Sequence, residues 1–368
     1  MTKLEQLFDE YGQSPWLDNL TREYLRDGTL ERMVASGIRG VTANPTIFAR
    51  AIEGSDDYDE QFRALIKAGV SVLDAYWELV VSDVEQACGI LRTTFEDSNG
   101  GDGFVSIEVA PELARDTDAT LAAARDLHKR IALPNVFVKI PATAEGIPAI
   151  RAMTSEGSSI NITLIFSLRR YTQVIDAYLD GLESFAAGGG DLATVHSVAS
   201  FFVSRVDTEV DHRLDALGSA AAIELRGQAA VAQTKLAYQL FRERFSGDRW
   251  RRLAARGANL QRPLWASTST KNPARSDTLY VDSLIGPETV NTLPEATIAA
   301  FEDHGRLGRS VDADVDAATE VMSRLRMVGI DMDDVGLRLE DQGIASFHQS
   351  FEAVLGALET KARGVSIR

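Results

Sequence analysis

Val136-Phe-Val-Lys-Ile-Pro141 is a short apolar run interrupted by one charged residue, Lys139. Short runs of β-branched and aromatic residues predict buried strands, and the amphipathic stretch 116–131 before this run predicts a helix. Similar runs alternate with helical stretches along most of the 368 residues. This alternation is typical of repeated β-α units with a parallel sheet. Eight such strands in one chain favour a (β/α)8 barrel, the TIM barrel fold of the α/β class.

The expected barrel carries helical additions. Two long connections, 51–103 and 203–262, have helical periodicity and are interpreted as insertions. The pattern is wholly helical from residue 294 onward, which predicts a C-terminal helical extension over about 294–368. We therefore expect one domain over residues 1–368, with the barrel at about 15–290. In chain order, the strands are predicted at 15–18, 40–44, 104–109, 136–141, 160–166, 194–200, 263–268 and 278–284.

Composition and charge limit the partners that the protein can have. The net charge of −16 argues against binding to nucleic acid or to an acidic membrane surface, because both need clustered lysine and arginine. A single cysteine, Cys88, excludes an internal disulfide framework and fits a reducing compartment. The N-terminus has no signal-peptide pattern, and no run approaches the roughly 18 apolar residues of a membrane span. We expect a cytoplasmic protein, and the sequence does not distinguish a monomer from a homodimer.

Lys139 needs a physical reason to lie inside an apolar strand. An ammonium group that is buried without a partner is strongly destabilising. Such a lysine therefore pairs with a carboxylate, loses its proton, or lies at a strand end that faces a cavity. The neutral amine is a nucleophile toward ketones. From this context alone, a structural ion pair and a functional amine are equally open.

Polar residues also occur at the expected carboxyl ends of other strands. Because side chains alternate along a strand, the polar residues of each strand share one face, and the apolar residues face the surrounding helices. The carboxyl ends of barrel strands carry the active sites of this fold, so we expect a site there. The pairs that share a face are Thr42 and Asn44, Ser106 and Glu108, Asn161 and Thr163, and Ser200 and Phe202.

Two cations follow later strands at the same end of the barrel. Arg205 comes after the sixth strand, and Lys271 lies in the hydroxyl-rich loop Ser267-Thr-Ser-Thr-Lys-Asn272. Phosphate binding needs cations or backbone amides that compete with water, so both residues are candidate phosphate ligands. The histidines show no metal-ligand spacing, so we expect no bound metal.

Two motifs resemble the signatures of transaldolases, specifically the longer bacterial branch of that family. They are Gly40-Val-Thr-Ala-Asn-Pro-Thr46 and Val136-Phe-Val-Lys-Ile-Pro-Ala-Thr143, which is followed by Gly146. The similarity runs from about Leu17 to Leu284 and is weaker in the helical tail. The resemblance implies an enzyme that acts on sugar phosphates without a cofactor.

The resemblance also implies roles for individual residues. Lys139 falls on the lysine that forms a Schiff base with the substrate. Glu108 matches the acid/base glutamate, which acts through a water near Thr163, and Asp18 matches the aspartate that handles the proton of the substrate hydroxyl. The residues implied to hold or line the substrate and its phosphate are Thr42, Asn44, Asn161, Ser200, Phe202, Arg205, Ser269 and Lys271.

The implied reaction moves a dihydroxyacetone unit between sugar phosphates, as in the non-oxidative pentose phosphate pathway. Fructose 6-phosphate or sedoheptulose 7-phosphate is the donor, and erythrose 4-phosphate or glyceraldehyde 3-phosphate is the acceptor. The chain departs from the family pattern around Asp18, in Ser200-Phe-Phe, and at Lys271, where many relatives have arginine. Lysine keeps the charge but not the bidentate geometry, so the departure at Lys271 concerns phosphate affinity.

Three other functions fit parts of the pattern. A fructose 6-phosphate aldolase of the same superfamily releases free dihydroxyacetone, but that shorter branch tends to carry glutamine and tyrosine in place of Glu108 and Phe202. A non-catalytic sugar-phosphate-binding barrel would be expected to have lost Lys139 or Glu108. A metal-dependent aldolase or isomerase would need a cluster of metal ligands.

Overall fold

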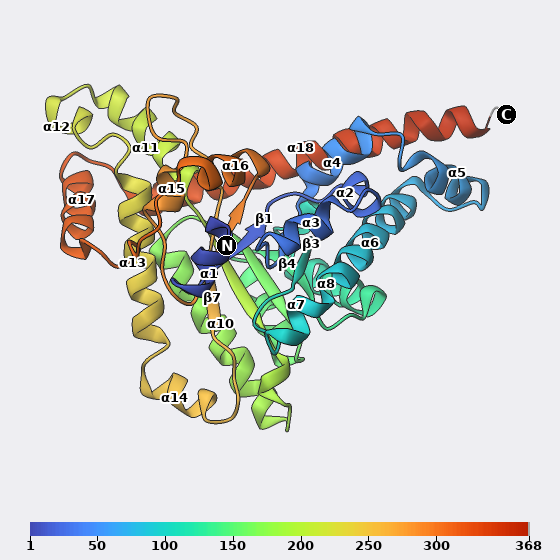
Figure 1. The fold of residues 1–368 in the computed structure, drawn as a ribbon, viewed down its shortest axis with the longest axis horizontal. Helices are drawn as coiled ribbons and strands as arrows, with labels where there is room; N and C mark the ends of the chain where they lie inside the picture. Colours follow the sequence, from blue (N-terminus) through green and yellow to red (C-terminus); the bar gives the residue numbers. More distant parts are fainter. Residues whose placement is uncertain (367–368) are drawn as a thin grey trace.

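Eight parallel strands form a closed barrel in the computed structural model, which describes residues 1–366 and the side chains of residues 1–364. Each strand pairs with the next one in the chain, and β8 pairs with β1 to complete the ring. Figure 1 shows strands such as β1, β3 and β4 at the centre of the molecule, with helices around them. The fold class predicted from the sequence is confirmed. The strands are β1 Gln13–Leu17, β2 Val41–Thr42, β3 Val105–Glu108, β4 Val136–Pro141, β5 Ile160–Ile165, β6 Ser197–Phe202, β7 Gln261–Ala266 and β8 Thr289–Leu293.

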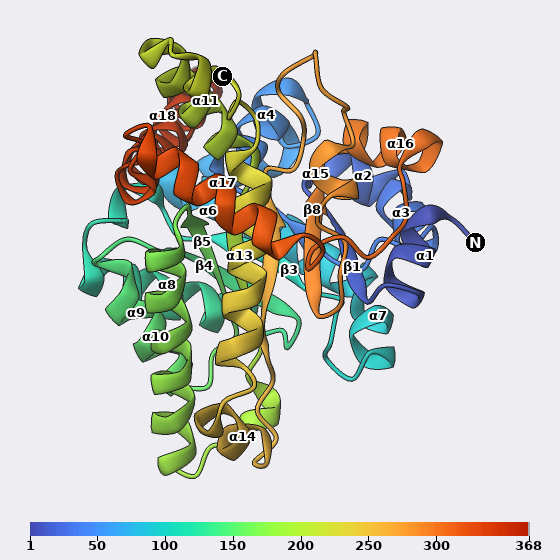
Figure 2. The ribbon, with the colours of Figure 1, turned by 90° about the vertical axis from the view of Figure 1, so that its left-hand side faces the viewer.

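Helices surround the barrel, fill its long connections and form its tail. Figure 2 shows α10 and α13 side by side along the barrel wall, with α14 near one end of both. Within residues 1–366, no helix is both long and apolar enough to cross a membrane. The helices are α1 Lys3–Asp9, α2 Arg22–Arg26, α3 Thr29–Ala35, α4 Pro45–Gly54, α5 Asp59–Lys67, α6 Val72–Ile90, α7 Arg92–Asp97, η1 Pro111–Leu113, α8 Thr117–Ile131, α9 Gly146–Ser155, α10 Leu168–Ala187, η2 Leu192–Thr194, α11 Ser204–Leu217, α12 Ala220–Ile223, α13 Ala229–Arg244, α14 Asp248–Ala254, α15 Leu279–Asp282, α16 Glu295–His304, α17 Val315–Met327 and α18 Met332–Ser366.

The position predicted for the last strand is wrong. Residues 278–284 contain α15, and β8 follows at Thr289–Leu293. The apolar run around Leu279 is too short for periodicity to separate a strand from one helical turn. The true strand contains Thr289 and Asn291, which are fully buried but give the segment the composition of a loop. The strand was not predicted because its buried residues include polar ones, which do not produce the apolar pattern of a buried strand.

The second strand is shorter than predicted because Asn44 begins a helix. β2 ends at Thr42, and the side-chain oxygen of Asn44 accepts a hydrogen bond from the backbone N–H of Ile47 at 3.0 Å. Asn44 is thus the N-cap of α4, and Pro45 occupies the first helical position, where a missing N–H costs nothing. This arrangement starts α4 directly at the carboxyl end of the barrel.

The side chains alternate between the two faces of the strands as expected, with an interruption in β5. Apolar residues such as Ile107 and Val138 are fully buried between the strands and the outer helices. Leu164 has a φ of +59°, and the register with β6 shifts between Ile162 and Ile165. A branched residue rarely adopts this left-handed conformation, and such strain concentrates near functional sites. The irregularity lies directly after Thr163, one of the predicted site residues.

The tail helix α18 packs over the carboxyl end of the barrel and continues beside α4 (Figure 1). Its close approach depends on Gly343, where an added Cβ would lie 2.9 Å from Cδ2 of Leu164. The hydroxyls of Thr46 in α4 and Ser350 in α18 are 2.8 Å apart and join the two helices. The C-terminal extension predicted from the sequence is therefore part of the barrel mouth.

A buried carboxylate holds α18 in this position. Glu340 is 3% exposed, and its two oxygens lie 3.3 Å from Arg115 and 3.2 Å from Arg170. Burial raises the pKa of Glu340, although the two arginines lower it. Moving α18 away would leave the buried charges of this group without their partners, which is unfavourable. The contacts of Glu340 with Arg115 and Arg170 therefore stabilise the position of α18.

Candidate active site

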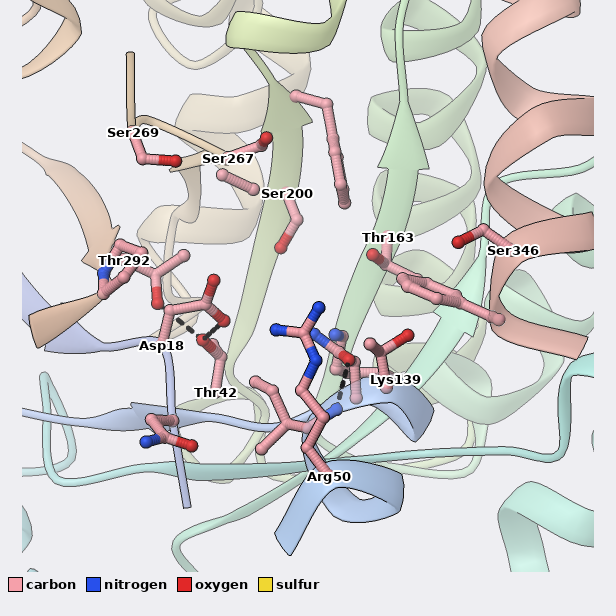
Figure 3. Close-up of a pocket in the computed structure, with 18 of the residues that line it drawn as sticks. Asp18, Thr42, Arg50, Lys139, Thr163, Ser200, Ser267, Ser269, Thr292 and Ser346 are labelled. Atoms are coloured by element: carbon pink, nitrogen blue, oxygen red, sulfur yellow. Dashed lines mark hydrogen bonds between the residues drawn. The ribbon is translucent and has the colours of Figure 1, made fainter. Parts of the chain in front are cut away.

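A cavity of about 540 Å³ opens at the carboxyl end of the barrel, between the strand ends and the helices α4 and α18. Figure 3 shows side chains from both sides of the barrel pointing into it. The structure brings together ten of the twelve residues that the sequence analysis proposed for the site. The other two, Glu108 and Asn161, are buried and do not line this cavity. The ten that line the cavity are Asp18, Thr42, Asn44, Lys139, Thr163, Ser200, Phe202, Arg205, Ser269 and Lys271.

Lys139 is paired with a carboxylate and also faces the cavity. Its Nζ lies 3.0 Å from Oε2 of Glu108 and donates a hydrogen bond to the carbonyl of Ala43 at 3.1 Å. The side chains of Lys139 and Glu108 are only 7% and 2% exposed. The sequence left open whether Lys139 is a member of a structural ion pair or an accessible amine. In the structure it is both.

The pair is suited to passing a proton between its members. Burial raises the pKa of Glu108, and this effect outweighs the lowering by Lys139. A carboxyl with a raised pKa takes a proton more readily than an ordinary glutamate. Transfer of one proton from Lys139 to Glu108 removes both buried charges and leaves a neutral amine at the cavity wall.

Thr163 supplies a hydroxyl that is free to bind something in the cavity. Its Oγ1 is buried and has no hydrogen-bond partner among the described residues. Buried polar atoms are almost always satisfied, so such an atom at a cavity wall indicates a position for a water or a substrate oxygen. Asn161 lies in the same strand as Thr163, and it pairs in register with Lys139 of β4.

Asn161 acts on the cavity through another residue. Its side-chain oxygen accepts a hydrogen bond from Ser200 Oγ at 2.7 Å, and its amide nitrogen donates to Ser106 Oγ at 3.0 Å. Both partners are buried. Asn161 therefore orients the hydroxyl of Ser200, which is the group that reaches the cavity wall.

Asp18 lies directly after β1, and hydroxyl groups fix its position. Its Oδ1 accepts a hydrogen bond from Thr42 Oγ1 at 3.1 Å, and Thr42 also contacts the hydroxyl of Thr292 (Figure 3). Burial raises the pKa of Asp18. Lys139 and Thr42 lower this pKa, whereas the nearby carboxylate of Glu295 raises it further. A carboxylate with a raised pKa is a better proton acceptor than an ordinary aspartate.

The two cations predicted from the sequence lie at the same cavity. The guanidinium of Arg205 is 5.4 Å from the ring centroid of Phe202, and Lys271 Nζ donates a hydrogen bond to Ser269 Oγ at 2.6 Å. Burial lowers the pKa of Lys271, and the positive charge of Arg205 lowers it further. Two like charges near one cavity favour an anionic ligand.

Sequence reasoning missed several residues of the cavity wall. Some come from α4 and α18, which are helices that no strand motif identifies as site elements. Others lie in β8, the strand whose position was predicted wrongly, or directly after β7 and β8. The residues missed include Arg50 of α4, Ser267, Thr292, Glu295, and Ser346 and Phe347 of α18. For Arg50, the only available signal was its place six residues after the N-cap of the helix that follows the first motif.

Glu295→Gln should move the acid limb of the pH–activity profile to lower pH. Activity that needs ionised Asp18 is lost as the pH falls through the raised pKa of that residue. Removing the charge of Glu295 removes one of the causes of the raised pKa, while glutamine can still accept the hydrogen bonds from Asn19 and Tyr24. The measurement is kcat/KM against pH, with Asp303→Asn on the exposed end of α16 as the control. An acid limb that stays at the same pH would contradict a role for ionised Asp18.

The chain is similar to known proteins along most of its length. The family model for Transaldolase/Fructose-6-phosphate aldolase matches residues 15–358. The chain is 50% identical over 354 residues to a transaldolase of Thermobifida fusca, with 96% of each chain covered. It is 50% identical over 356 residues to a transaldolase of Saccharopolyspora erythraea, with 96% of each covered, and 48% identical over 349 residues to one of Frankia alni, with 94% of each covered. A family model that spans most of the chain, together with relatives matched along nearly their whole length, places this barrel in the transaldolase/fructose-6-phosphate aldolase family.

Proposed function

We propose that the protein is a transaldolase that moves a dihydroxyacetone unit from a ketose phosphate to an aldose phosphate. Fructose 6-phosphate or sedoheptulose 7-phosphate serves as donor, and erythrose 4-phosphate or glyceraldehyde 3-phosphate as acceptor. One observation carries the proposal: the amine of Lys139 lies 3.0 Å from a buried carboxylate and lines a polar cavity in which Arg205 and Lys271 form no ion pair with any described residue.

The first half of the reaction forms and cleaves a covalent adduct. Glu108 takes a proton from Lys139, and the neutral amine attacks the ketone carbon C2 of the donor. Glu108 then returns a proton as the carbinolamine loses water, which gives an iminium ion. Asp18 removes the proton of the C4 hydroxyl, the C3–C4 bond breaks, and its electrons move to the iminium. An aldose phosphate leaves, and an enamine remains on Lys139.

The second half reverses these steps with a new aldehyde. The enamine carbon attacks the aldehyde carbon of the acceptor, and Asp18 returns its proton to the new alkoxide. Water hydrolyses the resulting iminium, with Glu108 as the acid/base group, and frees the longer ketose phosphate. The hydroxyl of Thr163 has no hydrogen-bond partner among the described residues, which supports a role for it in holding this water. The lysine serves as the electron sink, so the reaction needs no cofactor.

Hydroxyl and charged groups of the cavity hold the substrate. Asn44 uses its side-chain oxygen to cap α4, which leaves its amide group for a hydroxyl of the dihydroxyacetone unit. Ser200, oriented by Asn161, offers a second hydroxyl contact. Ser269, Arg205 and Lys271 lie where the phosphate of an extended sugar can be bound.

A coupled assay distinguishes transfer from simple aldol cleavage. Fructose 6-phosphate is supplied with and without erythrose 4-phosphate, and both glyceraldehyde 3-phosphate and free dihydroxyacetone are measured. We expect sustained turnover only when the acceptor is present. Equal turnover without acceptor, with stoichiometric release of dihydroxyacetone, would instead identify a fructose 6-phosphate aldolase.

A further inference from the structure

Arg50 is an unpaired cation at the mouth of the cavity. It lies in α4 and lines the same cavity as Arg205, at the start of α11, and Lys271, in the loop after β7. Figure 3 shows its side chain rising from α4 into the cavity. Arg50 forms no ion pair or side-chain hydrogen bond with any residue described in the structure, although carboxylates outnumber basic residues by 54 to 38 in the chain.

The acidic groups near the cavity are already engaged. Glu108 is paired with Lys139, and Glu295 accepts hydrogen bonds from Asn19 and Tyr24. Asp18 accepts a hydrogen bond from Thr42. None of these carboxylates lies within ion-pair distance of a cavity arginine among the described residues. The cavity is therefore left with more positive than negative charge.

The positive charges of Arg205 and Arg50 both act on Lys271. The pKa of Lys271 is lowered by burial first, then by Arg205, and also by Arg50, while Asp18 raises it. Like charges held around one cavity repel each other, and an anion bound between them relieves that repulsion. A phosphate dianion has three acceptor oxygens and can contact groups from more than one wall.

We propose that Arg50 is a third cationic ligand of the substrate phosphate and thereby selects for phosphorylated acceptors. The inference rests on the proposed function for the identity of the substrate. Lys271 provides a point charge without a fork, whereas the guanidinium of Arg50 can donate two parallel hydrogen bonds to phosphate oxygens. The phosphate is then held from α4 as well as from the start of α11 and the loop after β7.

The test compares phosphorylated with unphosphorylated acceptors in Arg50→Ala and Arg50→Lys. In a reaction with a covalent enzyme intermediate, kcat/KM for the acceptor reports only the second half-reaction, so erythrose 4-phosphate can be compared directly with D-erythrose. For Arg50→Ala we expect kcat/KM to fall roughly tenfold with erythrose 4-phosphate and to change less than about twofold with D-erythrose. Arg50→Lys should recover part of the loss. Arg252→Ala, on α14 away from the cavity, makes the same charge change and should leave both values unaltered.

A binding measurement separates failure of this inference from failure of the proposed function. Calorimetric titration with inorganic phosphate requires no turnover, and we expect Arg50→Ala to weaken phosphate binding roughly tenfold relative to Arg252→Ala. Unchanged phosphate affinity, or an equal loss of activity with both acceptors, would overturn the role of Arg50. Absence of any dihydroxyacetone transfer by the unaltered enzyme would instead overturn the proposed function, while the phosphate titration would still report on Arg50.

Discussion

Lys139→Met is expected to lower transaldolase turnover by about 10⁴-fold or more, because the other lysine of the cavity, Lys271, is hydrogen-bonded to Ser269 and has no ion-paired carboxylate among the described residues to take its proton. Methionine has nearly the length of lysine and no amine, so it removes the nucleophile with little change in volume. Glu108, whose pKa is already raised by burial, can remain protonated beside it. The measurement is steady-state turnover of fructose 6-phosphate with erythrose 4-phosphate.

A second lysine provides the control for this substitution. Lys235 in α13 donates a hydrogen bond to the carbonyl of Ala313 at 2.8 Å and does not line the cavity. Lys235→Met should keep nearly full activity. Circular dichroism and thermal unfolding of both variants show whether the barrel is intact. A folded Lys139→Met enzyme with more than a few per cent of normal turnover would contradict covalent catalysis at this position.

Glu108→Gln is expected to reduce kcat by about 10²- to 10⁴-fold, the range typical of a lost general acid/base. Glutamine keeps the shape of the side chain but can neither accept a proton from Lys139 nor donate one to a leaving hydroxyl. Formation and hydrolysis of the iminium should both slow, while the C–C cleavage assigned to Asp18 is unaffected. Rapid-mixing kinetics therefore should show slow formation of the adduct as well as slow steady-state turnover.

The substrate-binding parameters separate a chemical role of Glu108 from a structural one. Glu108 does not line the cavity, so its replacement should leave the affinity for inorganic phosphate unchanged. A loss of phosphate binding together with activity would indicate that Glu108 mainly keeps the strands in place. A nearly normal kcat for Glu108→Gln would show that the ion pair of Glu108 with Lys139 has no catalytic role.

Much of the barrel was predictable because its strands are apolar runs between helices. The strand Val136–Pro141 was predicted at its observed bounds. The prediction failed at β8, where Thr289 and Asn291 are buried among hydroxyl and amide partners and do not produce an apolar pattern. Residue type alone does not reveal that a polar side chain is buried, because burial depends on partners from distant parts of the chain.

The strand-borne part of the site was predictable for a similar reason. Residues such as Thr42 and Ser200 alternate with apolar neighbours at strand ends, and a closed barrel brings these ends together. Arg50 and Ser346 could not be found this way, since they lie on helices whose courses over the mouth are set by packing. The position of α18 depends on Gly343 and on the buried contacts of Glu340, which no local pattern connects to the strands.

Trapping of the covalent intermediate tests the central claim most directly. The enzyme is incubated with fructose 6-phosphate, reduced with borohydride, digested and examined by mass spectrometry. We predict a stable three-carbon adduct on Lys139 in the unaltered enzyme and in Lys235→Met, and none in Lys139→Met. An adduct on another residue, or turnover of substrate with no adduct under reduction, would contradict the mechanism.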